Sequence, residues 1–220
     1  IATSGIRLSK FHGIEIDDYA HEISKLSLWL AEHQMNLYFK DVFGESRPSL
    51  PLSDTGTIIC ENSANIDWND FCTRDSKTEI FIIGNPPYIG SRKQNKDQKE
   101  DIKNTLGHLT GYKRLDYISI WFFKASKYIV SKKEKCAFVS TNSVCQGEHV
   151  NLLWPELVKN IEINFAYKSI KWSNSARGNA GVIVVILGLT VISNDKKFIF
   201  ENKNMNIVRH INPYLLPFKD

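Results

Sequence analysis

The chain has 220 residues, of which 42% are hydrophobic and 24% are charged, a composition typical of a globular protein. Its length is sufficient for one α/β domain with a sizeable core. No apolar run approaches the ~20 residues that a membrane-spanning helix needs, so we expect no membrane partner. The formal net charge of +4 permits binding to nucleic acid without requiring it.

Short runs of β-branched and aromatic residues alternate with segments of helical spacing. This alternation predicts an α/β fold with a mostly parallel, doubly wound sheet. Asp18 is expected to be the N-cap of the first helix, and the charged residues 91–103 are expected to form a solvated loop and a short helix. The expected strands are residues 11–16, 57–60, 81–84, 137–139, 161–166 and 181–189, and the expected later helices are residues 115–130 and 150–158.

The four cysteines, Cys60, Cys72, Cys136 and Cys145, show no C-x-x-C spacing, so we expect no metal site. Cys60 and Cys136 lie in apolar runs that are typical of strands. They are therefore expected to be buried thiols of a protein from a reducing compartment.

The most informative segment is the apolar run 81–84 followed by Asn85-Pro86-Pro87-Tyr88. Two successive prolines fix φ and remove two backbone donors, so the carbonyl groups of Asn85 and Pro86 are held in place. Asn85 adds an amide oxygen, and Tyr88 adds an aromatic face. Rigid hydrogen-bond acceptors beside an aromatic ring suit a planar ligand with an exocyclic amine, such as adenine.

Polar residues also follow the two preceding predicted strands. Glu15 ends the first, where a carboxylate can accept hydrogen bonds from both hydroxyls of a ribose, and Ile16 can pack against a purine. Asn62 follows the second, where an amide can contact a purine edge. Because ligands of doubly wound sheets bind at the carboxyl ends of the strands, this pattern predicts a nucleoside-like ligand. The alternative is that Glu15 is an acid at a helix start and Asn62 is a turn residue.

These motifs resemble those of adenine-specific DNA amino-methyltransferases, which use S-adenosylmethionine. Residues 11–17 resemble the family's second motif, residues 60–68 resemble the third, and Asn85–Tyr88 match the catalytic motif in full. Residues 115–125 resemble the helix that follows the catalytic motif. The segment 138–147 resembles the sixth motif and the segment 171–182 the eighth, and both are distinctive of type IIG (MmeI-like) fused restriction-modification enzymes.

The resemblance implies a Rossmann-like methyltransferase fold and a bacterial, cytoplasmic enzyme that flips an adenine out of double-stranded DNA and methylates its N6 amine. The implied catalytic residues are Asn85, Pro86, Pro87 and Tyr88; the implied cofactor-binding residues are Glu15, Ile16, Asn62, Ser63 and Asn85; and the implied base pocket contains Tyr88 and Trp172.

The family's Gly-rich first motif has no counterpart in residues 1–10. We therefore expect a fragment that lacks the first strand of the sheet and the nuclease and target-recognition domains. We expect residues 1–210 to be a partial catalytic domain and residues 211–220 the start of a linker. Such a fragment is expected to bind S-adenosylmethionine weakly or not at all and to be inactive alone.

Two alternative functions remain open at the level of the sequence. The first is methylation of a protein glutamine or an RNA amine, because a planar amide presents the same hydrogen-bonding problem as adenine. The second is a catalytically silent scaffold within a larger assembly. A methyl-transfer assay that compares DNA, RNA and protein distinguishes them.

Overall fold

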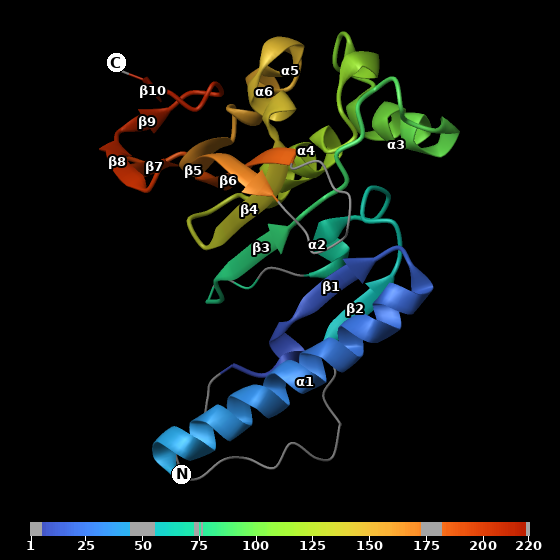
Figure 1. Ribbon diagram of the computed structural model, residues 1–220. Coiled ribbons are helices and arrows are strands. Elements are labelled where there is room, and N and C mark those ends of the chain that lie inside the picture. Colours follow the sequence, from blue (N-terminus) through green and yellow to red (C-terminus); the bar gives the residue numbers. More distant parts are fainter. Residues whose placement is uncertain (1–5, 45–55, 73–74, 76, 173–181, 219–220) are drawn as a thin grey trace. The chain divides into compact units, whose positions relative to one another are not determined.

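The computed structural model describes residues 6–44, 56–72, 75, 77–172 and 182–218 (Figure 1). The chain divides into two compact units, Ile1–Thr73 and Arg74–Asp220, and each is described by itself. Among the described residues, no helix has the length and hydropathy required to cross a membrane.

The first unit pairs two parallel strands with one long helix. Strands β1 (His12–Glu15) and β2 (Thr57–Cys60) are in register, with Glu15 opposite Cys60. Helix α1 (Asp18–Phe43) lies along this pair (Figure 1). The 3-10 turn η1 (Leu8–Lys10) precedes β1, and the one-turn helix α2 (Trp68–Phe71) follows β2.

The start of α1 differs by one residue from the prediction, because Asp17 and not Asp18 is the N-cap. The backbone of Asp17 is extended, and its carboxylate accepts a hydrogen bond from the N–H of Ala20 at 2.8 Å. Asp18 is then the first helical residue, where an acid also favours the helix dipole. Gly44 ends the helix in the left-handed conformation with φ 78°, which glycine adopts without strain.

The second unit is built on a six-stranded sheet in the order β3-β4-β6-β5-β7-β8. The sheet is mixed: β3 is parallel to β4 and β5 is parallel to β7, whereas β6 is antiparallel to both of its neighbours and β8 is antiparallel to β7. The strands are β3 (Ile80–Gly84), β4 (Glu134–Thr141), β5 (Ile161–Trp172), β6 (Val182–Val191), β7 (Lys197–Glu201) and β8 (Asn204–Val208).

The helices predicted over residues 115–130 and 150–158 are shorter than the periodicity predicts. Helix α4 (Ser119–Tyr128) begins four residues after Leu115, because residues 115–118 form turns. The predicted helix 150–158 is two helices, α5 (Gly147–Leu152) and α6 (Trp154–Leu157), with Pro155 in the first turn of α6. The remaining elements are α3 (Lys96–Leu106), η2 (Tyr112–Arg114), η3 (Asn142–Cys145) and the antiparallel pair of β9 (His210–Ile211) and β10 (Pro217–Phe218).

The core of the second unit joins α4 to the sheet and to α6. Phe122 of α4 meets Phe138 of β4 edge-on, with ring centroids 5.5 Å apart, and Trp154 of α6 at 6.3 Å. The indole N–H of Trp154 donates to the Val144 carbonyl at 2.7 Å, so this buried polar atom is satisfied. Packing against the aromatic side chains of the helices therefore holds β4, the neighbour of β3, in place.

Candidate active site

The segment Asn85–Tyr88 directly follows β3, as the sequence predicts. Pro86 is buried, Tyr88 is half-buried and Asn85 is exposed. The side chains of Asn85 and Tyr88 form no hydrogen bond with any other described residue. The predicted acceptor and the predicted aromatic ring are therefore both available to a ligand.

A hollow of about 470 Å³ lies beside this segment and is lined by consecutive residues from Tyr88 to Lys93. Its volume is within the range of small-molecule pockets. Its lining includes Tyr88 and the exposed cations Arg92 and Lys93. Neither cation forms an ion pair with a described residue. An aromatic ring next to unpaired cations is suited to a base and its flanking phosphates.

In the first unit, Glu15 and Asn62 lie at the carboxyl ends of the two parallel strands. The Glu15 Oε1 atom accepts the N–H groups of Ile16 at 2.9 Å and Asp17 at 3.0 Å, which fixes the turn into α1. Its Oε2 atom has no hydrogen bond to another residue that the structure describes. Glu15 thus has the turn role of the alternative interpretation and still presents one acceptor, next to the exposed side chain of Ile16.

Asn62 is a turn residue, as the alternative interpretation predicts. Its Oδ1 atom accepts the Ala64 N–H at 2.9 Å, and its carbonyl accepts the Asn65 N–H. The neighbouring Ser63 carbonyl accepts the indole N–H of Trp68 at 3.1 Å. Asn62 and Ser63 therefore shape the loop after β2, and their contact with a cofactor stays a prediction.

Two further predicted features fall partly outside the described residues. Trp172 ends β5, but its side chain and the motif residues 173–181 lie outside the described part of the chain, so its place in a base pocket stays a prediction.

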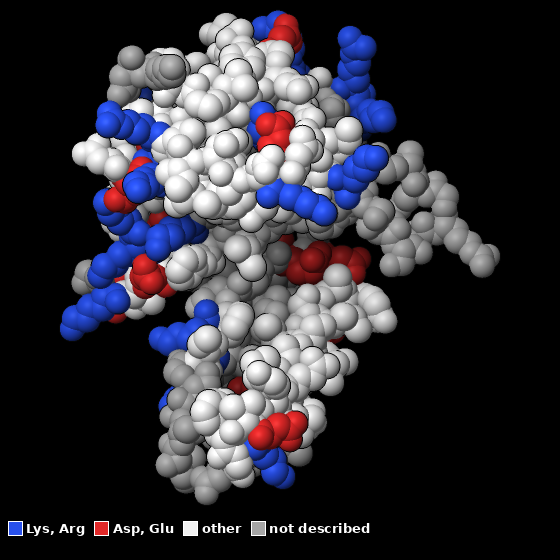
Figure 2. All heavy atoms as spheres, turned by 60° about the vertical axis from the view of Figure 1, so that its left-hand side comes forward, with Lys and Arg blue, Asp and Glu red and all other residues white. Residues whose placement is uncertain are grey.

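Of the basic residues other than Arg92 and Lys93, Arg114 pairs with Glu148 at 2.7 Å and Lys168 pairs with Glu201 at 3.2 Å. On the face shown in Figure 2, acidic side chains are interspersed among the basic ones.

Two titratable groups close to this segment, the buried Asp116 and the half-buried His149, carry shifted pKa values. Burial raises the pKa of the Asp116 carboxyl, and burial lowers the pKa of the His149 imidazole. The Asp116 N–H donates to His149 Nε2 at 2.8 Å, which requires the neutral ring with its proton on Nδ1. The sequence reasoning did not single out His149, because one histidine in a short helix carries no periodic signal.

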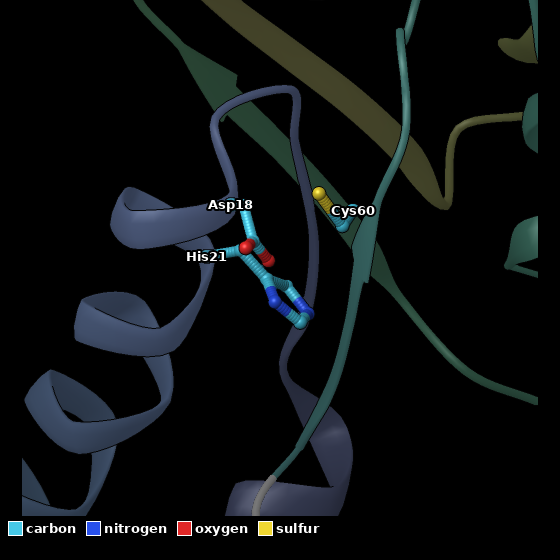
Figure 3. Close-up of side chains that lie close together, drawn as sticks. All are labelled: Asp18, His21 and Cys60. Carbon is cyan, nitrogen blue, oxygen red and sulfur yellow. The ribbon is translucent and has the colours of Figure 1, made fainter.

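The first unit also contains a cluster of Asp18 and His21 from α1 and Cys60 from β2 (Figure 3), with ligand atoms within 4.8 Å of one another. His21 Nε2 lies 3.1 Å from the Ile58 carbonyl, and the Cys60 thiol donates to the Ile16 carbonyl at 3.9 Å. Desolvation and then the neighbouring carboxylates raise the pKa of the Cys60 thiol, so it stays protonated. These contacts give the cluster a structural role at the turn into α1.

The prediction that Cys60 is buried is wrong, because the end of β2 is exposed in the first unit. The prediction for Cys136 is confirmed, and burial raises the pKa of its thiol. Cys145 is also buried, which raises its pKa to about 12. Both thiols of the second unit are therefore inert packing groups at neutral pH.

Comparisons with known proteins agree with this arrangement. Residues 2–201 match the family described as the DNA-methyltransferase domain of MmeI. DNA methyltransferase A of Bacillus subtilis (strain 168) is 49% identical over 213 residues, which are 96% of this chain and 24% of that protein. The structure of the type IIL restriction-modification enzyme MmeI in complex with DNA matches with a TM-score of 0.89 and 39% identity, over 98% of this chain and 30% of the MmeI chain.

A DrdV–DNA complex matches with a TM-score of 0.53 and 16% identity, over 93% of this chain and 24% of its own, which supports the fold alone. The chain spans 24% of the length of the curated relative and 30% of the MmeI chain. The family match covers most of the chain and includes the segment Asn85–Tyr88. The chain therefore belongs to the MmeI family of DNA-methyltransferase domains.

Proposed function

We propose that this chain is the catalytic part of a restriction-modification protein that transfers a methyl group from S-adenosylmethionine to the N6 amine of an adenine in double-stranded DNA. The observation that carries the proposal is the unpartnered Asn85 side chain next to a half-buried Tyr88 that lines a hollow. The DNA complex of the 39% identical MmeI supports DNA as the partner.

The end of β1 fits the nucleoside part of the cofactor. Glu15 Oε2 is an available acceptor for a ribose hydroxyl, and the exposed side chain of Ile16 offers an apolar surface to a purine. Asn62 and Ser63 are proposed to border the same nucleoside. When bound, S-adenosylmethionine supplies an electrophilic methyl group on a sulfonium.

The segment after β3 is proposed to capture and orient the base. An adenine inside a duplex cannot be reached, so it must be flipped out before reaction. The Tyr88 ring stacks on the flipped base, a contact worth about 1–3 kcal/mol. Arg92 and Lys93, which also line the hollow, neutralise the flanking phosphates.

Asn85 and Pro86 are proposed to activate the amine. The lone pair of the adenine amine is delocalised into the ring, so the amine is a poor nucleophile. Hydrogen bonds donated by the amine to the Asn85 amide oxygen and the Pro86 carbonyl favour a tetrahedral nitrogen and localise the lone pair. This is catalysis by positioning and oriented dipoles, and it needs no general base of matched pKa.

The test is methyl transfer by the complete natural protein with labelled S-adenosylmethionine and unmethylated duplex DNA. Asn85→Ala should lower turnover by roughly a hundredfold or more while DNA binding persists, because it removes a contact used mainly in the transition state. The matched control is Asn104→Ala on the exposed side of α3, which should leave turnover unchanged.

Nucleoside analysis of the product completes the test. N6-methyl-2′-deoxyadenosine from the DNA supports the proposal, and any other methylated base contradicts the adenine assignment. Label in RNA or in a protein glutamine, with none in DNA, favours the first alternative function. An absence of transfer to all three substrates favours the scaffold.

A further inference from the structure

The peptide of Ile89, immediately after Tyr88, is held by residues far along the chain. Its carbonyl accepts a hydrogen bond from the Tyr117 N–H at 3.0 Å and a second from the Gln94 side-chain Nε2 at 3.0 Å. The next residue, Gly90, carries no such contact to a distant residue. The lining of the hollow is therefore fixed at the residue that follows Tyr88 in the chain.

Gln94 is the residue whose burial the sequence does not reveal. It lies in the polar stretch 91–103 that was expected to be solvated, yet it is only 6% exposed. Its Nε2 donates both to the Ile89 carbonyl and to the Leu115 carbonyl, each at 3.0 Å. Both hydrogens of this amide are thus used to tie the loop after Tyr88 to the segment 115–117.

Asp116 lies in the turn whose Tyr117 N–H donates to the Ile89 carbonyl. Its carboxylate accepts the Ile118 N–H at 3.3 Å and the Ser143 hydroxyl at 3.5 Å, which fixes this turn. Its own N–H donates to His149. The peptide of Ile89 is therefore clamped between Gln94 and the turn that contains Asp116 and Tyr117.

We propose that Gln94, together with Asp116, is a positioning residue that fixes the Ile89 peptide and so holds the Tyr88 ring ready to receive the flipped base. This inference rests on the proposed function. A ring that is already held in the correct orientation stacks on the base without paying the cost of being ordered at the moment of capture. Gln94 does not touch the substrate; it acts through Tyr88.

The variant that tests the clamp is Gln94→Glu, which keeps the shape of the side chain and replaces the donor with a carboxylate facing two carbonyls. The matched control is Gln98→Glu, because Gln98 Oε1 accepts the Asn95 N–H in the capping box at the start of α3 and a Glu keeps that acceptor. Gln94→Met removes the donor without introducing a charge, and it replaces Gln94→Glu if the latter fails to fold.

In the complete natural protein, Gln94→Glu should lower kcat by about tenfold or more, with KM for S-adenosylmethionine unchanged, because misplacement of a positioned group is costly to the reaction step. With 2-aminopurine at the target position, the fluorescence rise on binding should shrink. Gln98→Glu should match the wild type in both measurements. Wild-type kcat in Gln94→Glu, or in Gln94→Met where that variant is used, overturns the proposal.

A readout that needs no substrate separates this proposal from the proposed function. The Tyr117 amide donates to the clamped carbonyl, so its hydrogen exchange should be at least about tenfold faster in Gln94→Glu and unchanged in Gln98→Glu. Unchanged exchange at Tyr117 overturns the clamp even if the protein methylates DNA. Faster exchange together with a wild-type protein inactive on DNA leaves the clamp in place and rejects the proposed function instead.

Discussion

The strands that carry the candidate residues are packed very differently in the two units. In the second unit, the strand before Asn85 is paired with β4, and the Phe138 side chain of β4 packs against the fully buried Phe122 of α4. In the first unit, Glu15 ends one strand of a two-stranded pair, and α1 buries only His21 while most of its large apolar side chains are exposed.

This difference in packing indicates that the chain is more rigid around Asn85 than around Glu15. Acceptors that must match a reacting amine gain from a support that does not move, whereas a carboxylate that captures a ribose tolerates a more mobile support. Under the proposed function, packing around β3 and β4 holds the residues that act on the amine, and β1 with its turn presents the carboxylate to the ribose. The following four predictions test this contrast.

The largest expected effect is on folding of the second unit. Trp154→Ala should lower the free energy of unfolding by about 3–5 kcal/mol, because it empties a nearly fully buried site in the core. Leu30→Ala in α1, where the side chain is 52% exposed, should cost less than about 1 kcal/mol. Denaturant unfolding of both variants measures the contrast. Equal costs in the two units would show that α1 is as firmly packed as the core.

The next effect concerns the stacking ring of the second unit. Tyr88→Ala should weaken capture of the flipped base by about 1–3 kcal/mol, and Tyr88→Phe should be mild because the ring face does the stacking. Binding of DNA with 2-aminopurine at the target position measures this. If the Ala and Phe variants behave alike, the ring does not stack on the base.

A smaller effect is expected at the ligand-binding end of the first unit. Glu15→Gln keeps the side-chain shape but exchanges a charge-assisted hydrogen bond for a neutral one, which should lower cofactor affinity by about fivefold. Calorimetry with S-adenosylmethionine on the complete natural protein is the measurement. Glu61→Gln, at the exposed position after β2, is the matched control. A loss of affinity in the control alone would place the ribose contact elsewhere.

The smallest effect is the pH dependence of the second unit. His149 has a lowered pKa in the folded state, so below pH 6.5 the unfolded chain binds the proton first and the free energy of unfolding decreases as pH falls. Asp116, whose pKa is raised, acts in the opposite direction as pH falls toward 3.8.

Urea midpoints between about pH 7.5 and pH 5.5 measure the His149 contribution, because that interval lies around its unperturbed pKa. A His149→Gln variant cannot titrate and should show a smaller decrease than the wild type. An identical decrease in both proteins would assign the pH dependence to other groups.

Several features could be predicted from the sequence because they are local. Strand β2 has the predicted bounds Thr57–Cys60, and Asn85–Tyr88 follows its predicted strand, since a short apolar run ended by polar residues or prolines specifies both. Strands β7 and β8 were missed, because their alternating residues lie in a polar region without a long apolar run.

Lys197 shows why such a strand escapes detection. Its side chain is 1% exposed and its Nζ lies 2.8 Å from Glu162 Oε1, so a position that looks like a surface charge is buried with its partner. The sequence alone does not distinguish an exposed charged residue from one that is buried in an ion pair with a residue of another strand.

The sequence by itself determined which residues are proposed to carry the chemistry: the prolines after β3, the amide of Asn85 and the ring of Tyr88. Only the tertiary structure decided that β6 runs antiparallel to its neighbours and that Gln94 is buried against the Ile89 carbonyl. The physical reason is the same in both cases. Periodicity reports which face of an element is apolar, but strand direction and the burial of an amide depend on partners that are distant in the chain.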